Sequence, residues 1–166
     1  MRLIYPGSFD PPTKGHIHIA RRAAALCGDL VVLVMRNPGK PLRLETEQRA
    51  ALLERCLVGT PGIRVECGSG LLADEVRRLK GQAILRGLRD QGDYAAEKRV
   101  ADAFRAVFDI ETLFMQCDAS LSHISSSLVR ELLGLKGPAQ ALVPEEIFDD
   151  VWKAYCPEGQ LKGELR

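Results

Sequence analysis

Short runs of apolar residues alternate along the chain with longer segments in which apolar residues recur every three or four positions. The short runs, such as "DLVVLVM", are rich in Val, Ile and Leu and predict buried β-strands. The spacing in the longer segments predicts amphipathic helices. The expected strands cover residues 2–6, 29–35, 63–67, 82–87 and 110–115. The expected connecting helices cover residues 16–27, 46–58, 71–80 and 93–108.

Turn and cap residues separate these elements. Gly28, Gly59 and Gly81 follow three of the helices, where a left-handed C-cap favours glycine. Thr46 and Asp93 are suited to the N-caps of the second and fourth helices. Two further helices are expected after the last strand, over residues 125–135 and 144–155. The second opens at Pro144, and its apolar stripe consists of Ile147, Phe148, Val151, Trp152 and Tyr155.

The alternation of strands and helices predicts repeated βαβ units and hence a mostly parallel sheet covered on both faces. We expect an α/β fold: a Rossmann-like, doubly wound, five-stranded parallel sheet with C-terminal helices. With the common strand order 3-2-1-4-5, the loops after the first and fourth strands lie side by side at the carboxyl edge, where such sheets bind ligands. Residues 1–156 are expected to form one domain, and residues 157–166 a C-terminal tail.

Composition limits the classes of partner. The 23 basic residues nearly balance the 22 acidic ones, and aromatic residues make up only 5%, so we expect no binding to nucleic acid or to a membrane surface. Five cysteines are widely separated, without the spacing of a zinc or dithiol site, and favour buried thiols in a reducing cytoplasm. "MRLIYPG" lacks the apolar core of a signal peptide, and no apolar run is long enough to span a bilayer. We therefore expect a soluble, cytoplasmic protein.

The stretch "YPGSFDPPTKGHIHI" places unusual turn chemistry directly after the first strand. Gly7 lets a ligand approach the backbone closely, and Ser8 adds a hydroxyl group. Thr13 is suited to cap a helix that begins near His16, and a helix N-terminus favours a phosphate. A tight structural turn would explain the glycines and prolines equally well, but the histidine favours a phosphate site. His18 does not form a metal pair with His16, because residues two apart diverge on a helix.

Basic and hydroxyl side chains also follow the other strands. Lys40 lies in "RNPGKP" after the second strand, and Arg86 and Arg89 lie in "RGLRDQGDY" after the fourth, where two guanidiniums can grip phosphate oxygens. Three serines, residues 125–127, begin a helix after the fifth strand. Each group alone has an ordinary explanation as a surface charge or a helix cap. Together they indicate phosphoryl or nucleotidyl transfer, since no Ser-His-Asp set, carboxylate pair or Walker lysine motif is evident.

The motifs "GSFDPPTKGH", "RGLR" and "ISSSLVR" together resemble those of the phosphopantetheine adenylyltransferase family, a branch of the nucleotidyltransferase superfamily. The resemblance extends in order and length to about residue 155. It implies that the chain transfers the adenylyl group of ATP to 4'-phosphopantetheine, giving dephospho-coenzyme A and pyrophosphate in coenzyme A biosynthesis. It also implies Mg²⁺ as cofactor, held by the ATP phosphates with no protein ligand, and a homohexamer built as a dimer of trimers.

The resemblance further implies roles for individual residues. The acceptor phosphate would attack the α-phosphate of ATP directly, without a covalent enzyme intermediate. The residues expected to act in catalysis are His16, Lys40, Ser8 and Arg89. Those expected to bind ATP are Gly7, Ser8, Phe9, Gly15, His16, Arg89, Glu97, Ser125, Ser126 and Ser127. Those expected to bind the acceptor are Ser8, Lys40, Leu72 and Arg86.

Four positions depart from the family pattern. "NPGKP" has one lysine where two are usual, Ala96 and His123 replace aromatic residues, and His18 stands where an aspartate is common. Two alternatives therefore stay open: a sister nucleotidyltransferase that uses another phosphorylated acceptor, and a non-catalytic sensor of nucleotide or coenzyme A. A comparison of acceptors would identify the first, and tight ATP binding without pyrophosphate release would favour the second.

Overall fold

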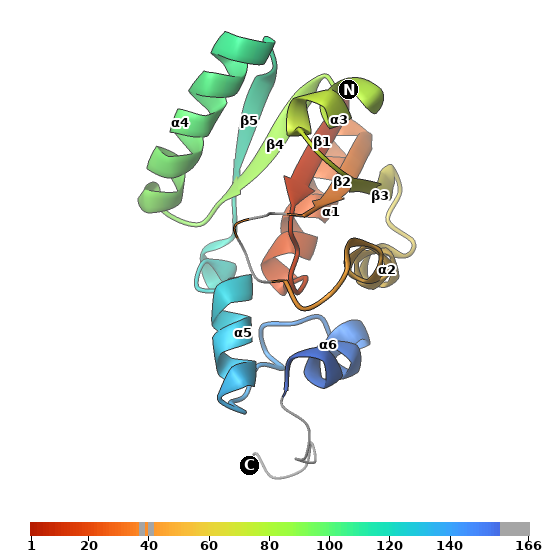
Figure 1. Cartoon of the computed structure of the whole chain (residues 1–166), viewed down its shortest axis with the longest axis vertical. Coiled ribbons are helices and arrows are strands. Elements are labelled where there is room, and N and C mark those ends of the chain that lie inside the picture. The colour runs from red at the N-terminus through yellow and green to blue at the C-terminus, as the bar shows by residue number, and fades with distance from the viewer. Residues whose placement is uncertain (37–38, 40–41, 157–166) are drawn as a thin grey trace.

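Five parallel strands form one sheet in the computed structural model, which describes residues 1–36, 39 and 42–156 (Figure 1). The order in the sheet is β3-β2-β1-β4-β5, so the predicted fold and strand order are confirmed. The strands are β1 (Arg2–Gly7), β2 (Asp29–Met35), β3 (Ile63–Gly68), β4 (Ala83–Leu88) and β5 (Glu111–Gln116). Every strand begins and ends within one residue of its predicted range.

Helices connect the strands and complete the C-terminal part of the fold. They are α1 (Lys14–Cys27), α2 (Thr46–Leu57), α3 (Leu72–Arg78), α4 (Gln91–Phe108), α5 (Ser126–Gly134) and α6 (Phe148–Tyr155). Short 3₁₀ turns lie at Ala119–Leu121 and Glu145–Ile147. The second of these turns takes the place of the first part of the last predicted helix, so α6 begins four residues after Pro144.

Alternate residues of the central strands face opposite sides of the sheet, and each side has its own core. On one side Leu3, Tyr5 and Val32 pack with buried residues of α1, α2, α5 and α6. On the other side Ile4 and Leu33 pack with α3 and with the phenylalanines of α4. The strand β2 is completely buried over residues 30–34, which explains its unbroken apolar sequence. The sheet is therefore doubly wound, as the sequence predicts.

Two predicted helix caps are wrong. The N-cap of α2 is Glu45, and the hydroxyl of Thr46 instead accepts a hydrogen bond from Arg49 at 3.0 Å. The N-cap of α4 is Asp90, whose Oδ1 accepts from the backbone N–H of Asp93 at 2.8 Å. Thr46 is the first residue of α2 and Asp93 the third residue of α4, so both helices begin earlier than the predicted caps imply.

The glycines after the helices have two different roles. Gly28 and Gly59 adopt the predicted left-handed conformation, with φ of 72° and 74°. At the end of α3 the left-handed residue is Lys80 (φ 54°), so the prediction for Gly81 is wrong. A Cβ on Gly81 would lie 2.4 Å from Cγ1 of Ile4 in the central strand. Gly81 is therefore required for close packing and not for its backbone conformation.

The carboxyl ends of the strands face α5 and α6, which lie together at one end of the molecule (Figure 1). The N–H of Lys14, at the start of α1, donates to the carbonyl of Leu142 at 3.0 Å and joins this end to the sheet. The predicted tail, residues 157–166, and Lys40 lie outside the described residues. No helix in the part of the chain that the structure describes has both the length and the apolar character needed to cross a membrane.

Candidate active site

A pocket of about 580 Å³ opens at the carboxyl edge of the sheet. It is lined by residues that follow β1, β2, β4 and β5 and by residues of α1, α3, α4 and α5. All the site residues predicted from the sequence, except the undescribed Lys40, line this pocket: Gly7, Ser8, Phe9, Gly15, His16, Leu72, Arg86, Arg89, Glu97, Ser125, Ser126 and Ser127. The structure thus brings together residues that are up to about 120 positions apart in the sequence.

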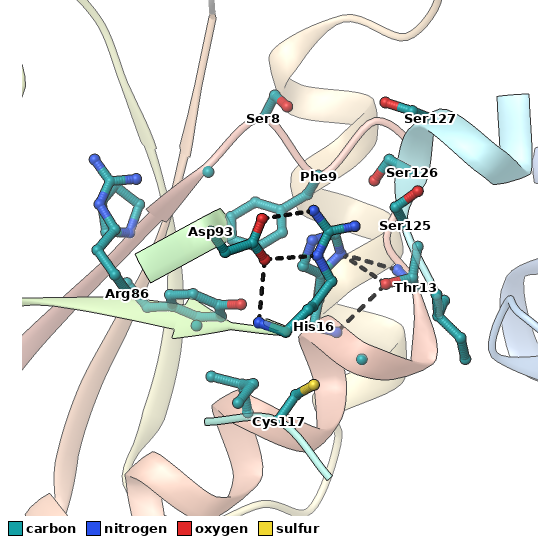
Figure 2. A pocket seen from close by; sticks show the side chains of 18 of the residues that line it. Ser8, Phe9, Thr13, His16, Arg86, Asp93, Cys117, Ser125, Ser126 and Ser127 are labelled. Carbon is teal, nitrogen blue, oxygen red and sulfur yellow. Dashed lines mark hydrogen bonds and ion pairs between the residues drawn. The ribbon is translucent and has the colours of Figure 1, made fainter. Parts of the chain in front are cut away.

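His16 is held by the cap of its own helix. The backbone N–H of Thr13 donates to Nδ1 of His16 at 3.1 Å, and the N–H of His16 points back to the Thr13 hydroxyl at 3.4 Å (Figure 2). Because Nδ1 accepts a hydrogen bond, the proton of the neutral ring lies on Nε2. Burial of the ring, together with the positive charge of Arg89, lowers the pKa of His16 to about 4. The ring is therefore a neutral donor in the pocket at physiological pH.

The ring of Phe9 packs against the ring of His16. Its ring meets the His16 ring edge to face, with the centroids 5.0 Å apart, and meets the Tyr5 ring at 5.4 Å. Phe9 is buried and has a positive φ of 48°. A Cβ on Gly7 would lie 2.8 Å from Cζ of Phe9, so only glycine leaves room for this ring. Gly7 and the left-handed conformation of Phe9 thus allow an aromatic ring to pack against the histidine.

Arg89 is fixed by a carboxylate of α4. Its Nε and Nη2 donate to the two carboxylate oxygens of Asp93 at 2.8 Å and 2.9 Å (Figure 2). The hydrogen bonds from Arg89 lower the pKa of Asp93, so its carboxylate stays ionised. Asp93 is the third residue of α4, and its carboxylate makes this bidentate contact and does not cap the helix.

Arg86 forms a similar but longer ion pair with another acid of α4. Its Nε lies 3.3 Å from Oε2 of Glu97, also on α4. Four arginines line the pocket against two acids, and both acids are paired. The excess positive charge favours a polyanionic ligand.

The three serines begin α5 and lie across the pocket from Arg86 (Figure 2). Ser125 is the N-cap, and its hydroxyl accepts from the N–H of Leu128 at 3.1 Å. The hydroxyl of Ser126 donates to the carbonyl of Pro11 at 2.9 Å. Ser126 therefore connects the start of α5 to the opening loop. The backbone N–H groups of the first turn of a helix favour an anion, and those of α5 face the same pocket as the serines.

Sequence reasoning missed several residues that line or brace the pocket. Arg36 and Arg130 add positive charge, and Asp93 holds Arg89. Arg49 is completely buried and donates to the carbonyls of Ser8 and Met35. The last letter of "ISSSLVR" was a usable signal for Arg130, whereas nothing local in the sequence distinguishes the buried Arg49 from a surface arginine of an amphipathic helix.

His18 lies apart from His16, as the helical spacing predicts. It faces a second hollow, next to Arg22, Gln116 and Asp118, and does not line the main pocket. Among the described residues, no group of three or more His, Cys, Asp or Glu side chains could hold a metal ion.

Comparisons with known proteins identify the family of the chain. A model of the family described as cytidylyltransferase-like matches residues 4–132. A phosphopantetheine adenylyltransferase from Clostridium botulinum (strain Langeland) is 38% identical over 151 residues, covering 90% of this chain and 92% of that protein. One from Clavibacter michiganensis is 41% identical over 150 residues, covering 88% of this chain and 92% of that protein.

A solved structure supports the fold. The crystal structure of the lipopolysaccharide core biosynthesis protein from Thermoplasma volcanium is similar, with a TM-score of 0.53 over 71% of this chain and 96% of that chain, at 23% identity. That likeness concerns the fold alone. On the family model and the close relatives together, the chain belongs to the cytidylyltransferase-like family and, within it, to the phosphopantetheine adenylyltransferases.

Proposed function

We propose that this chain transfers the adenylyl group of ATP to 4'-phosphopantetheine, giving dephospho-coenzyme A and pyrophosphate. The observation that carries the proposal is the neutral imidazole of His16 in a pocket with excess positive charge, in a chain whose relatives bear the name of this activity. A nucleotide triphosphate and a phosphorylated acceptor are both anions, and such a pocket suits both.

In the proposed reaction an oxygen of the acceptor phosphate forms a bond to the α-phosphorus of ATP. The bond from that phosphorus to the oxygen leading to the β-phosphate breaks, and pyrophosphate leaves. No protein nucleophile is needed, because the acceptor oxygen is already anionic at neutral pH. The contribution of the protein is positioning and stabilisation of the charge that builds on the transferred group.

His16 would donate from Nε2 to an oxygen of the α-phosphate. The hydrogen bond from the Thr13 N–H to Nδ1 fixes the ring in this tautomer before the substrates bind. Arg89 would bind the ATP phosphates, held in place by Asp93. The start of α5, with Ser125, would provide further donors to the triphosphate.

The acceptor would lie on the side of Arg86 and Leu72. We propose that Ser8, Arg86 and the undescribed Lys40 hold its phosphate, and that Leu72 packs against the pantetheine arm. Mg²⁺, bound to the triphosphate, would neutralise part of its charge. The chemistry of the site supports an ion held by the phosphates, because Asp93 and Glu97 are each engaged with an arginine.

We further propose a homohexamer in the cytoplasm. Helix α4 has no buried residue in the single chain, and apolar residues are exposed on it and on β5: Tyr94, Val100, Val107 and Leu113. Such an apolar surface is typical of a contact between subunits. The five cysteines are unpaired, as is usual in a reducing compartment.

The test of the reaction is pyrophosphate release from ATP and Mg²⁺ with three acceptors assayed in parallel: phosphopantetheine, nicotinate mononucleotide and glycerol phosphate. We expect turnover with phosphopantetheine alone. Turnover only with another acceptor would identify a sister enzyme, and ATP binding without turnover on any acceptor would identify a sensor. Either result contradicts the proposed function.

The role of His16 is tested by His16→Ala. Loss of a preorganised donor to the developing charge lowers kcat by about 100-fold or more, while the thermal unfolding midpoint shows that the fold is kept. The matched control is His123→Ala, because His123 is exposed and does not line the pocket. A kcat of His16→Ala within a few-fold of the wild-type value would contradict the mechanism.

A further inference from the structure

The opening loop, which connects β1 to α1, accepts hydrogen bonds from side chains of three helices. Arg49 of α2 donates to the carbonyl of Ser8. Arg130 of α5 donates to the carbonyl of Asp10 at 2.6 Å. Tyr155 of α6, 145 positions along the chain, donates its hydroxyl proton to Oδ1 of Asp10. Arg49 and Arg130 donate to backbone carbonyls of the loop, whereas Tyr155 donates to a side chain of the loop.

Asp10 and Tyr155 are deeply buried, with exposed fractions of 0% and 2%. Within the described part of the chain, Oδ2 of Asp10 has no hydrogen-bond partner. The nearby guanidiniums of Arg49 and Arg130 donate to backbone carbonyls. The hydroxyl of Tyr155 is therefore the donor that determines where this carboxylate lies, because a buried carboxylate without a donor is strongly disfavoured.

The Tyr155 hydroxyl is suited to remain a donor. Burial, together with the hydrogen bond to Asp10 and its charge, raises the pKa of Tyr155 above its ordinary value. Helix α6, which carries Tyr155, is packed against the main core through Val151 and Trp152. The carbonyl of Tyr155 also accepts from Arg43 at 3.1 Å. The hydroxyl thus provides a fixed point outside the loop.

Asp10 is linked to the active site through its neighbour in the chain. Phe9 precedes it, is itself 2% exposed, and has its ring 5.0 Å from the ring of His16. Displacement of Asp10 moves the backbone of Phe9. Since the Phe9 ring supports the His16 ring, the displacement also changes the direction of the His16 donor.

We propose that Tyr155 is a positioning residue for adenylyl transfer, which acts through Asp10 and Phe9 to orient His16. The inference rests on the proposed function, in which His16 acts on the α-phosphate. It assigns to the last helix of the fold a role in catalysis, although Tyr155 does not line the pocket.

The first test is Tyr155→Phe, which removes one oxygen atom and keeps the ring in the core. We expect kcat to fall by about tenfold or more, since a small displacement of a catalytic group is costly. We expect the KM values for ATP and phosphopantetheine to change by less than about twofold, because the groups that bind the ground state are kept. An unchanged kcat would overturn the proposal.

The matched control is Val151→Ala on the same helix. Val151 is fully buried but forms no hydrogen bond to the loop, so its truncation destabilises α6 without releasing Asp10. We expect a lower thermal midpoint with kcat within about twofold of wild type. If Val151→Ala lowers kcat as much as Tyr155→Phe does, the effect is one of helix stability and the proposal is wrong.

A double-variant comparison tests the route through Asp10. In Asp10→Ala the acceptor of the Tyr155 hydroxyl is absent, so the additional change Tyr155→Phe has no further effect on kcat. A second loss of about tenfold in the double variant would show that Tyr155 acts independently of Asp10, contrary to the proposal.

A measurement without substrates separates this proposal from the proposed function. The ¹⁵N shifts of the His16 imidazole and of the Thr13 amide report the hydrogen bond that fixes the ring. We expect them to change in Tyr155→Phe and to remain unchanged in Val151→Ala. If the wild-type protein turns over no acceptor, the proposed function fails while these spectra still decide the positioning role. Unchanged spectra in Tyr155→Phe would overturn it.

Discussion

At the scale of single residues, the protonation state of His16 determines the chemistry available to the pocket. A protonated ring could not accept the hydrogen bond from the Thr13 N–H, so it would lose the orientation that this contact provides. Burial and the nearby Arg89 keep the ring neutral, with a pKa of about 4. Arg89, which would bind the ATP phosphates, therefore also helps to keep His16 in the neutral form.

This shift of the pKa predicts a dependence of stability on pH. Between about pH 6.5, the ordinary pKa of histidine, and pH 4, the unfolded chain binds a proton at His16 that the folded chain does not. The free energy of unfolding therefore falls as the pH is lowered through this window, with an upper limit of about 3 kcal/mol from this residue.

Urea unfolding at pH 7, 5.5 and 4.5 measures the effect, with His16→Asn as the comparison. We expect a smaller loss of stability for the variant than for the wild-type protein over this window. Equal losses would show that His16 titrates normally in the folded protein.

Asp93→Asn tests how Arg89 is held. The amide retains the size of the carboxylate but loses its charge and one acceptor, so Arg89 is no longer fixed by two charge-assisted bonds. We expect the KM for ATP to rise by about tenfold. The control is Asp102→Asn, which breaks an exposed ion pair with Lys98 on the same helix and leaves the KM unchanged. Equal KM values for the two variants would contradict the role of Asp93.

At the scale of elements, local patterns predict where strands and helices lie but not every contact at their ends. "RGLRDQGD" contains two aspartates with the chemistry to cap α4, and the sequence analysis predicts the second, Asp93. Asp90 is the cap because α4 begins at Gln91, and Asp93, the third residue of the helix, pairs with Arg89 instead. Similarly, Gly81 follows a helix and predicts a left-handed cap, but its neighbour Lys80 adopts that conformation while Gly81 packs against β1.

Gly81→Ala tests this packing. The new methyl group would lie 2.4 Å from the side chain of the buried Ile4, so strand or loop must shift, at a cost of about 1–3 kcal/mol. Thermal or denaturant unfolding measures it. Gly134→Ala at the end of α5 is the control, because its methyl group meets nothing within 4 Å, and we expect it to be neutral or slightly stabilising. Equal stability of both variants would contradict the packing role.

At the scale of the whole molecule, the two sides of the sheet differ. The side covered by α1, α2, α5 and α6 holds the larger core. On the other side, α4 contributes only partly buried phenylalanines, and its outer surface is apolar at Val100 and Val107, which are 42% and 69% exposed. These two valines are one heptad apart and share a face of the helix.

Val100→Asp tests the proposed assembly. A buried unpaired carboxylate is strongly unfavourable at a subunit contact, so we expect the molar mass in light scattering to fall below that of six chains. The control is Leu26→Asp, because Leu26 is 79% exposed on α1, on the other side of the sheet. A wild-type monomer, or a hexamer that tolerates Val100→Asp, would contradict this assembly surface.

The sequence by itself determined the elements. The strand order was expected because it is common in such sheets, and the pocket lining was expected from the loops at the strand ends together with the family resemblance. Apolar periodicity is a local property, and loops at the carboxyl ends of adjacent parallel strands meet in any fold of this topology. Only the tertiary structure decided how the residues are held. The contacts of Tyr155 with Asp10, of Arg49 with Ser8 and of Ser126 with Pro11 join segments 41 to 145 positions apart. Such contacts depend on how helices pack, because one buried polar group must find its partner on another element, and no local pattern encodes that choice.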